Sequence, residues 1–341
     1  MPKMKFALVT ADRAHQKKIY MDGERSDVTS FMSWIRVWDG IHLSFEALRA
    51  EDRSYLSDFD VVMFSGHPNH IQDIIDIARE LKNTSAVTMY YPEGSLQLYD
   101  NSINGFHPEY VEAWNACDIV SSAEEDKLGY YESFVSRETL VRFIHVPLTR
   151  EMEDGYFFIP RYQKNPRLVL VYGDNNPNHP MIAMAAAHKL GADVIGADIR
   201  GHDFGRILPG LKTSEISKLG QYPFLRVLGR TVVHFYPTEW IGTARQAIAC
   251  ACVGTPCIGN RDSHTQKRLF PKLGFQIYDI PGMVEAAKWL IDDQTLYNET
   301  VAHARASLHF YGLEATKKRF MEAVEDARKL KKTQVDIGAL T

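Results

Sequence analysis

Residues 232–260 read VVHFYPTEWIGTARQAIACACVGTPCIGN, and this stretch decides the expected fold. Its apolar opening, 232–236, stops at Pro237, as a buried parallel strand does. The small, helix-favouring residues 243–252 predict a helix, and the segment 255–259 predicts the next strand. The stretch therefore predicts a strand, a loop, a helix and a second strand of one parallel sheet.

The loop between this strand and this helix is the first candidate for ligand binding. In such a unit the helix begins at the carboxyl edge of the sheet, and its first N–H groups have no partner within the helix. Those N–H groups and the positive end of the helix macrodipole favour a phosphate group. Gly242, Thr243 and Arg245 stand at this point, and Arg245 adds a guanidinium group. We therefore expect a nucleotide diphosphate at residues 242–245.

Motifs in and after this stretch resemble those of a known family. In chain order they are H-x-Y-P, E-x-x-G, a helix of small residues, G-T-P-C-I-G and T-Q-x-x-L-F-P. This layout resembles the donor-binding half of GT-B glycosyltransferases, particularly the retaining group called family 4. The likeness is detailed over roughly residues 230–295 and extends to the rest of the chain only as architecture.

The resemblance implies a GT-B fold: two Rossmann-like, doubly wound α/β domains facing across a cleft, with a C-terminal helix crossing back to the N-terminal domain. It implies a hexosyltransferase-like enzyme that moves a sugar from a nucleotide diphosphate sugar, its co-substrate, without a metal or other cofactor. In family 4 a glutamate five residues before the glycine of G-x-P contacts the ribose or the sugar. Ala249 stands there in this chain, and Glu239 and Gln246 are the nearest polar substitutes.

Predicted strands alternate with predicted helices along the chain, which favours doubly wound parallel sheets. The alternation breaks at 147–166, where acidic, aromatic and proline residues follow no period, and then it restarts. We therefore expect an N-terminal acceptor-side domain over 1–150 and a C-terminal donor domain over 151–312. A last helix, 313–331, is expected to pack back on the first domain.

Two further segments carry neither a strand nor a helix period. Residues 95–107 predict a loop, and residues 198–222 predict a glycine-rich irregular segment. A short helix is expected next, at 223–228.

Composition limits the class of protein. A chain of 341 residues suits two domains, and 45% hydrophobic with 24% charged residues is ordinary for a globular protein. A net charge of −4 gives no general basic field for nucleic acid. The four cysteines lack metal-ligand spacing, so we expect buried thiols in a reducing compartment. No apolar stretch approaches a membrane span or a signal peptide, and we expect a cytoplasmic protein.

Candidate donor-binding residues follow predicted strands of the second domain, because ligands bind at the carboxyl ends of such sheets. Glu239 is the leading candidate among the acidic residues, and its alternative role is to stabilise the helix dipole. The alternative for Arg245 is a solvated surface arginine. Family 4 usually brings an arginine and a lysine from the loop after the first strand, and Lys212 or Arg261 would replace them here. The other candidates are Gly173, Arg200, Gly242, Thr243, Gln246, Asn260, Thr265 and Gln266.

The candidate catalytic residues of the first domain are Glu93, Asp100 and His67. Glu93 follows a predicted strand, where a carboxylate could remove the acceptor proton in an inverting transfer. A retaining transfer can rely instead on the leaving phosphate. As alternatives, a glutamate in a Pro-Glu-Gly turn is often only exposed, and His67 could cap the next helix. We expect no metal site, because no second cluster has ligand spacing.

Several functions stay open on this sequence. The leading hypothesis is a glycosyltransferase whose acceptor is a glycan, a small molecule or modified DNA. A second is a phage-type enzyme that glycosylates DNA bases, because such enzymes are GT-B proteins of similar length with an acid after a tyrosine-rich strand. A third is a catalytically inactive GT-B-like binding protein, which Ala249 favours. A nucleotide-sugar epimerase of the same fold is more distant.

Overall fold

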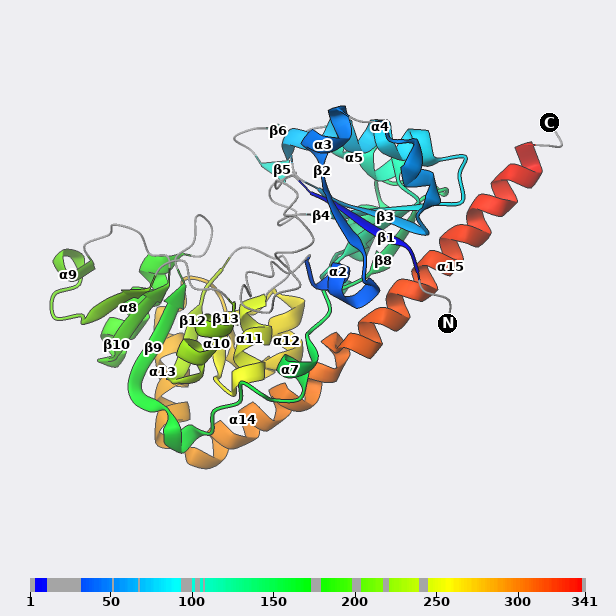
Figure 1. The fold of residues 1–341 in the computed structure, drawn as a ribbon. Helices are drawn as coiled ribbons and strands as arrows, with labels where there is room; N and C mark the ends of the chain where they lie inside the picture. Colours follow the sequence, from blue (N-terminus) through cyan, green and yellow to red (C-terminus); the bar gives the residue numbers. More distant parts are fainter. Residues whose placement is uncertain are drawn as a thin grey trace. The chain divides into compact units, whose positions relative to one another are not determined.

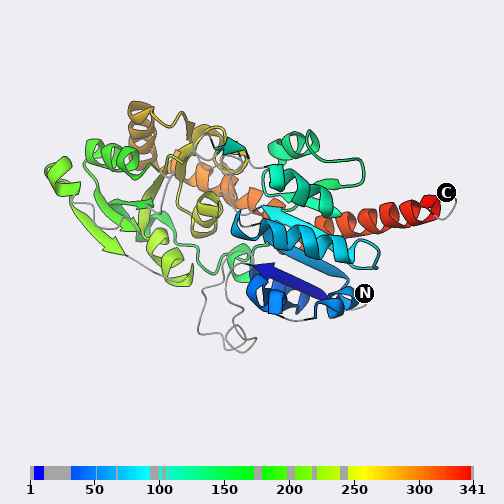
Figure 2. The same cartoon turned by 90° about the horizontal axis from the view of Figure 1, so that it is seen from above.

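The computed structural model of the chain describes residues 4–10, 32–50, 52–66, 68–92, 100–101, 105–106, 108–172, 179–197, 204–216, 221–238 and 245–338. The chain forms two compact units (Figures 1 and 2). Unit 1 comprises Met1–Pro147 and Leu313–Thr341, and unit 2 comprises Leu148–Gly312. The chain therefore leaves unit 1 after Pro147 and returns to it at Leu313.

Unit 1 contains a six-stranded parallel sheet with the order β2-β1-β3-β4-β7-β8. Every residue of β1, β3, β4 and β7 is buried, as expected for parallel strands covered on both faces. The strands are β1 (Phe6–Thr10), β2 (Ile41–Ser44), β3 (Val61–Gly66), β4 (Val87–Pro92), β7 (Ile119–Ser122) and β8 (Leu140–Phe143). The helices are α2 (Met32–Trp38), α3 (Phe45–Ala50), α4 (Ile71–Leu81), α5 (Pro108–Ala116), α6 (Leu128–Glu132) and α15 (Leu313–Gly338).

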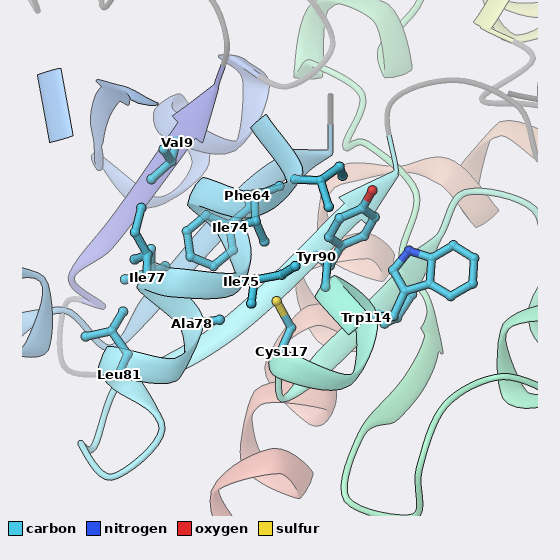
Figure 3. Close-up of a cluster of buried hydrophobic side chains, with 14 of the residues drawn as sticks. Val9, Phe64, Ile74, Ile75, Ile77, Ala78, Leu81, Tyr90, Trp114 and Cys117 are labelled. Atoms are coloured by element: carbon cyan, nitrogen blue, oxygen red, sulfur yellow. The ribbon is translucent and has the colours of Figure 1, made fainter. Parts of the chain in front are cut away.

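Helices α4 and α5 cover one face of this sheet. The apolar residues of α4 recur at helical spacing, so Ile74, Ile75 and Ala78 lie on one buried stripe. Figure 3 shows this stripe against Phe64 and Tyr90 of the sheet. The residues of this stripe and of the sheet below it are therefore part of one buried core.

Helix α15 packs on the other face of the unit 1 sheet. Its Phe320 ring lies 4.8 Å from the Trp34 ring and 5.3 Å from the Trp38 ring, centroid to centroid, and 6.0 Å from Phe6. Phe320 is fully buried, so the last helix completes a hydrophobic core begun by the first strand.

Ionic contacts fix α15 along its length. The Lys331 amine donates to Ala86 O at 2.7 Å and to Asp118 Oδ2 at 3.2 Å. Asp118 also accepts from the backbone N–H of Thr88 at 2.8 Å. One turn earlier, Arg328 pairs with Asp60 at 2.6 Å. Residues 180 and more positions apart in the chain are therefore joined at one edge of unit 1.

Unit 2 contains a second six-stranded parallel sheet, with the order β11-β10-β9-β12-β13-β14. In sequence order this is 3-2-1-4-5-6, the order of Rossmann folds. The strands are β9 (Asn165–Tyr172), β10 (Asp193–Ala197), β11 (Thr213–Ile216), β12 (Thr231–Tyr236), β13 (Cys257–Asn260) and β14 (Gly274–Phe275). The helices are α7 (Arg150–Glu153), α8 (Pro180–Leu190), α9 (Phe204–Ile207), α10 (Gln221–Gly229), α11 (Arg245–Val253), α12 (His264–Leu269), α13 (Ile280–Asp292) and α14 (Gln294–Ser307).

The predicted pair of doubly wound parallel sheets is confirmed, and the stretch that opens the sequence argument forms β12, α11 and β13. The second of these strands starts at Cys257, two residues later than expected. Gly254 has a left-handed backbone (φ 72) that ends α11, and Pro256 cannot donate to a ladder. All four cysteines are buried and free, as expected.

Two expectations about irregular segments are wrong. The segment 198–222 contains α9 and β11, and the segment 95–107 contains a two-stranded antiparallel ladder, β5 (Asp100–Asn101) with β6 (Gly105–Phe106). β11 is an edge strand with mostly exposed side chains, so it has no apolar run to reveal it. Within the described residues, no helix has the length and apolarity needed to cross a membrane.

Candidate functional site

The strand order of unit 2 marks one place at its carboxyl edge. The order reverses between β9 and β12, because the chain moves from β9 toward β11 and then returns to β12 on the other side. Right-handed crossovers therefore place α8 and α11 on opposite faces of the sheet. Ligands of open α/β sheets bind at such a switch point, in the crevice outside the strand ends. Pro180 of α8 and Arg245 of α11 begin the helices that flank it.

Helix α11 presents its first turn at this edge. Arg245 is its first residue and is exposed, whereas residues 247–253 are all buried. The Oε1 atom of Gln246 is buried and has no hydrogen-bond partner among the described residues. Ala249 is 8% exposed and packs inside the unit, so a side chain at that position faces the interior. The polar groups that this helix offers to a ligand therefore come from its first two described residues.

Three predicted site residues lie at or after the end of β13 and are buried: Asn260, Thr265 and Gln266. Asn260 donates to Thr238 O at 2.9 Å and accepts from the N–H of Asp262 at 2.9 Å. Gln266 donates to Cys257 O at 2.9 Å and to Leu273 O at 3.1 Å. Both amides thus hold backbone at the ends of β12 and β13, and their contact with a ligand stays a prediction.

Two basic residues proposed as phosphate partners lie at opposite edges of the sheet. Lys212 directly precedes β11, so it stands at the amino edge, away from the first turn of α11. Arg261 directly follows β13 at the carboxyl edge, and its side chain is 55% exposed. Because β11 was not expected, Lys212 could not be excluded from the site by its position in the sequence.

Most of the remaining predicted site residues fall outside the described residues. These are Gly173, Arg200, Glu239, Gly242 and Thr243 in unit 2, and His67 and Glu93 in unit 1. Asp100 lies in β5, where its Cα pairs with that of Phe106. The catalytic roles of His67, Glu93 and Asp100 stay predictions. Among the described residues, no group of three or more His, Cys, Asp or Glu side chains could hold a metal ion.

The sequence argument gave no site role to two histidines near the switch point. His179, directly before α8, has a left-handed backbone (φ 43), which is rare for a residue with a side chain and is strained. His234 of β12 is fully buried and its Nδ1 donates to Leu170 O at 2.9 Å. Burial lowers the pKa of His234 to about 4, so this ring is neutral and its Nε2 is a buried acceptor. The available signals were the position of His179 directly before a proline that begins a helix, and a histidine, His234, within an apolar strand.

The carboxyl edge of unit 1 also holds polar groups that were missed. The Glu124 side chain is buried two residues after β7, and its backbone is held by Ser122 Oγ, which donates to Glu124 O at 2.8 Å. His145 is buried two residues after β8. Ser65, at the end of β3, has a buried hydroxyl without a partner. Glu124 and His145 come just after a strand in the sequence, as Glu93 does. This position was the signal that could have identified them.

Comparison with known proteins identifies the architecture. No family model and no curated sequence matches the chain. A phage T4 alpha-glucosyltransferase, solved with UDP and a 13-mer DNA containing an HMU base, superposes with a TM-score of 0.64 at 9% identity, over 94% of this chain and 100% of that chain. The chain has the GT-B fold.

Other GT-B structures agree with this assignment. The trehalose 6-phosphate synthase of Burkholderia multivorans superposes with a TM-score of 0.68 at 9% identity, over 95% of this chain and 98% of that chain. TarM of S. aureus, in complex with UDP among other ligands, superposes with a TM-score of 0.61 at 10% identity, over 77% of this chain and 55% of its own. At these identities the likeness establishes the GT-B fold.

Proposed function

We propose that this protein is a glycosyltransferase that moves a sugar from a nucleotide diphosphate sugar to a hydroxyl-bearing acceptor. The observation that carries the proposal is the switch point of unit 2, where α11 begins with Arg245 in a GT-B fold. The resemblance of its donor half to family 4 is part of the same proposal.

The chemistry of the edge suits a pyrophosphate. The first N–H groups of a helix and a guanidinium group stabilise the negative charge that develops on the leaving diphosphate. In this proposal they do so without a metal ion. Because Ala249 is buried, contacts with the ribose or sugar would come from Gln246, and from Glu239 in the predicted loop before the helix. The buried Oε1 of Gln246 is an acceptor that a ligand hydroxyl would satisfy.

UDP-sugars are the first donors to test. The phage alpha-glucosyltransferase and TarM were both solved with UDP. The acceptor in this proposal is a glycan, a small molecule or modified DNA. The net charge of −4 argues against an extended basic surface for binding the DNA backbone.

A thermal-shift screen against UDP, GDP, ADP, dTDP and their sugars tests the proposal. A ligand at 100 times its Kd stabilises the protein by roughly 2.7 kcal/mol, which is a readily measured shift. Stabilisation by no nucleotide or nucleotide sugar would contradict the proposal and favour a GT-B-like protein with another role.

The matched variants for this screen are Arg245→Ala and Arg226→Ala. Arg226 is an exposed arginine of α10, the neighbouring helix. We expect Arg245→Ala to weaken nucleotide binding roughly tenfold or more with an unchanged melting temperature. Arg226→Ala should leave the affinity unchanged. Equal affinities in the two variants would remove Arg245 from the site.

A further inference from the structure

The amino edge of unit 2, opposite the proposed donor site, contains a buried amine. Lys164 directly precedes β9 and is 6% exposed. Its Nζ donates to Gly229 O at 2.5 Å, to Thr255 Oγ1 at 2.9 Å and to Val253 O at 3.3 Å. Gly229 and Val253 are the last residues of α10 and α11, so one side chain binds the carboxyl-terminal ends of both helices.

Groups from several helices and strands form hydrogen bonds around this contact. Thr255 Oγ1 lies 3.0 Å from Leu228 O and 3.3 Å from Thr231 O, which connects the end of α10 with the start of β12. Tyr297 of α14 donates its hydroxyl to Gly254 O at 3.1 Å. The N–H of Ile159 donates to Val253 O at 3.1 Å. The carboxyl-terminal end of α11 is thus held by α14 and by the segment that enters unit 2 from unit 1.

The protonation state of the amine changes this contact. An ammonium group has three N–H donors and matches the three oxygen acceptors, whereas a neutral amine has two. A cation at a helix carboxyl-terminal end also interacts favourably with the macrodipole, and here it faces two such ends. Against this, a buried charge loses its hydration. Burial accordingly lowers the pKa of Lys164 to about 7, and the nearby Cys250 has the opposite, smaller effect on that pKa.

We propose that Lys164 is a proton-sensitive anchor of α10 and α11, through which pH alters the stability of unit 2 and the binding of a donor at the other end of α11. The second half of this proposal rests on the proposed function. The first half depends only on the amine and its three acceptors.

Other titratable groups also face the amine. They are Cys250 of α11, with Cys257 of β13 beside it, and Tyr297 of α14, over which Arg161 is stacked. Burial raises the pKa of the Cys250 thiol and of the Tyr297 phenol, so both stay neutral. The Arg161 guanidinium stays charged.

The direction of the pH effect follows from proton counts. In the unfolded chain Lys164 keeps its proton up to about pH 10.4, whereas in the folded chain it loses the proton near pH 7. Between these values the unfolded state binds more protons, so the contribution of Lys164 to the free energy of unfolding rises with pH. Lys164→Met keeps most of the side-chain volume and removes this contribution.

The first measurement is the melting temperature of the full-length protein from about pH 6.5 to 8.5. We expect the wild type to gain roughly 5 °C over Lys164→Met across this range. Lys189→Met is the control, because Lys189 is a lysine at the carboxyl-terminal end of a helix, α8, but is exposed. Parallel curves for the wild type and Lys164→Met, or an equal effect in Lys189→Met, would overturn the anchor. If the methionine variant does not fold, Lys164→Arg, which does not titrate here, replaces it in the comparison.

The second measurement is the affinity for UDP-glucose at the same two pH values. Its pyrophosphate does not titrate in this range, so a change reflects the protein. Helix α11 spans nine residues, or roughly 13 Å, and a positive charge at its far end favours an anion at its first turn. We expect the wild type to bind roughly threefold more weakly at the higher pH and Lys164→Met to show no change.

The two measurements separate the two proposals. A stability difference without binding of any nucleotide sugar of the thermal-shift screen would contradict the proposed function and leave the anchor standing. An equal pH dependence of UDP-glucose affinity in both proteins would overturn the link between Lys164 and the donor site. Absence of the stability difference would overturn the anchor whatever the donor result.

Discussion

The two units build the same type of sheet and close it in different ways. In unit 1, α15 arrives from the far end of the chain and contributes Phe320 to an aromatic cluster and Lys331 to a half-buried ion pair. In unit 2, helices close in sequence pack through small residues, and one buried amine joins two helix ends. In unit 1, a helix from a distant part of the chain is held by large side chains and charges. In unit 2, helices that are close in sequence are held by close backbone packing.

The largest expected effect tests the aromatic closure of unit 1. Phe320→Ala removes a fully buried ring between Trp34, Trp38 and Phe6, so we expect a loss of roughly 3 to 5 kcal/mol in the free energy of unfolding of unit 1. Urea denaturation followed by tryptophan fluorescence measures it. Lys318→Ala, at an exposed site of the same helix, serves as the control. A loss under about 1 kcal/mol would show that α15 contributes little to the unit.

The ion pair of α15 is expected to rank second. Lys331→Met leaves Asp118 half-buried without its cation, which should cost roughly 2 to 3 kcal/mol. The double variant Lys331→Met with Asp118→Asn should recover part of this loss, because no unpaired charge remains. Strictly additive losses in urea denaturation would argue against a direct interaction between the two side chains.

Two glycines test the close packing of unit 2. Gly254 and Gly191 both end helices with left-handed backbones, φ 72 and φ 70. A methyl group on Gly254 would lie 2.5 Å from the Phe158 ring, whereas one on Gly191 would meet nothing within 4 Å. We expect roughly 1 kcal/mol of destabilisation for Gly191→Ala and about twice that or more for Gly254→Ala. Equal melting temperatures for the two variants would contradict the role given to packing around Gly254.

The smallest effect is expected at the surface of unit 1. Lys82 and Glu138 form a pair at 3.2 Å in which both side chains are about half exposed. Solvent screens such pairs, so Lys82→Ala should change the free energy of unfolding by less than roughly 0.5 kcal/mol. A larger change would mean that exposed charges, and not only the half-buried pair of α15, contribute to unit 1.

The sequence predicted the strands that are buried on both faces, because long apolar runs ending at proline or glycine have few other interpretations. β12 and β13 are examples. The prediction of two parallel sheets rested on such strands in both halves of the chain. It missed β2 and β11, which are short edge strands with half-buried or exposed side chains. The position of an edge strand depends on its pairing with the backbone of the neighbouring strand. This pairing produces no pattern in the edge strand's own sequence.

The candidate site was predictable only in part. Arg245 could be placed at the start of a helix, because that start follows from the pattern of small residues. Asn260 and Gln266 also lie at or after the end of a strand, but their amides bind backbone groups 22 and 7 positions away. The buried Lys164 was equally hidden, since its three acceptors come from two helix ends and a threonine 65 to 91 positions away. Polar contacts of this range leave no periodic signal.

Unit 2 is an uninterrupted stretch of chain inserted between the two parts of unit 1. During synthesis, residues 148–312 therefore emerge from the ribosome before α15 exists. Until then the side chains of Phe6 and Trp34 lack their last cover, and the nascent first half remains open to chaperones or to aggregation. A message that stops after codon 312 would yield a complete second half attached to an unfinished first one.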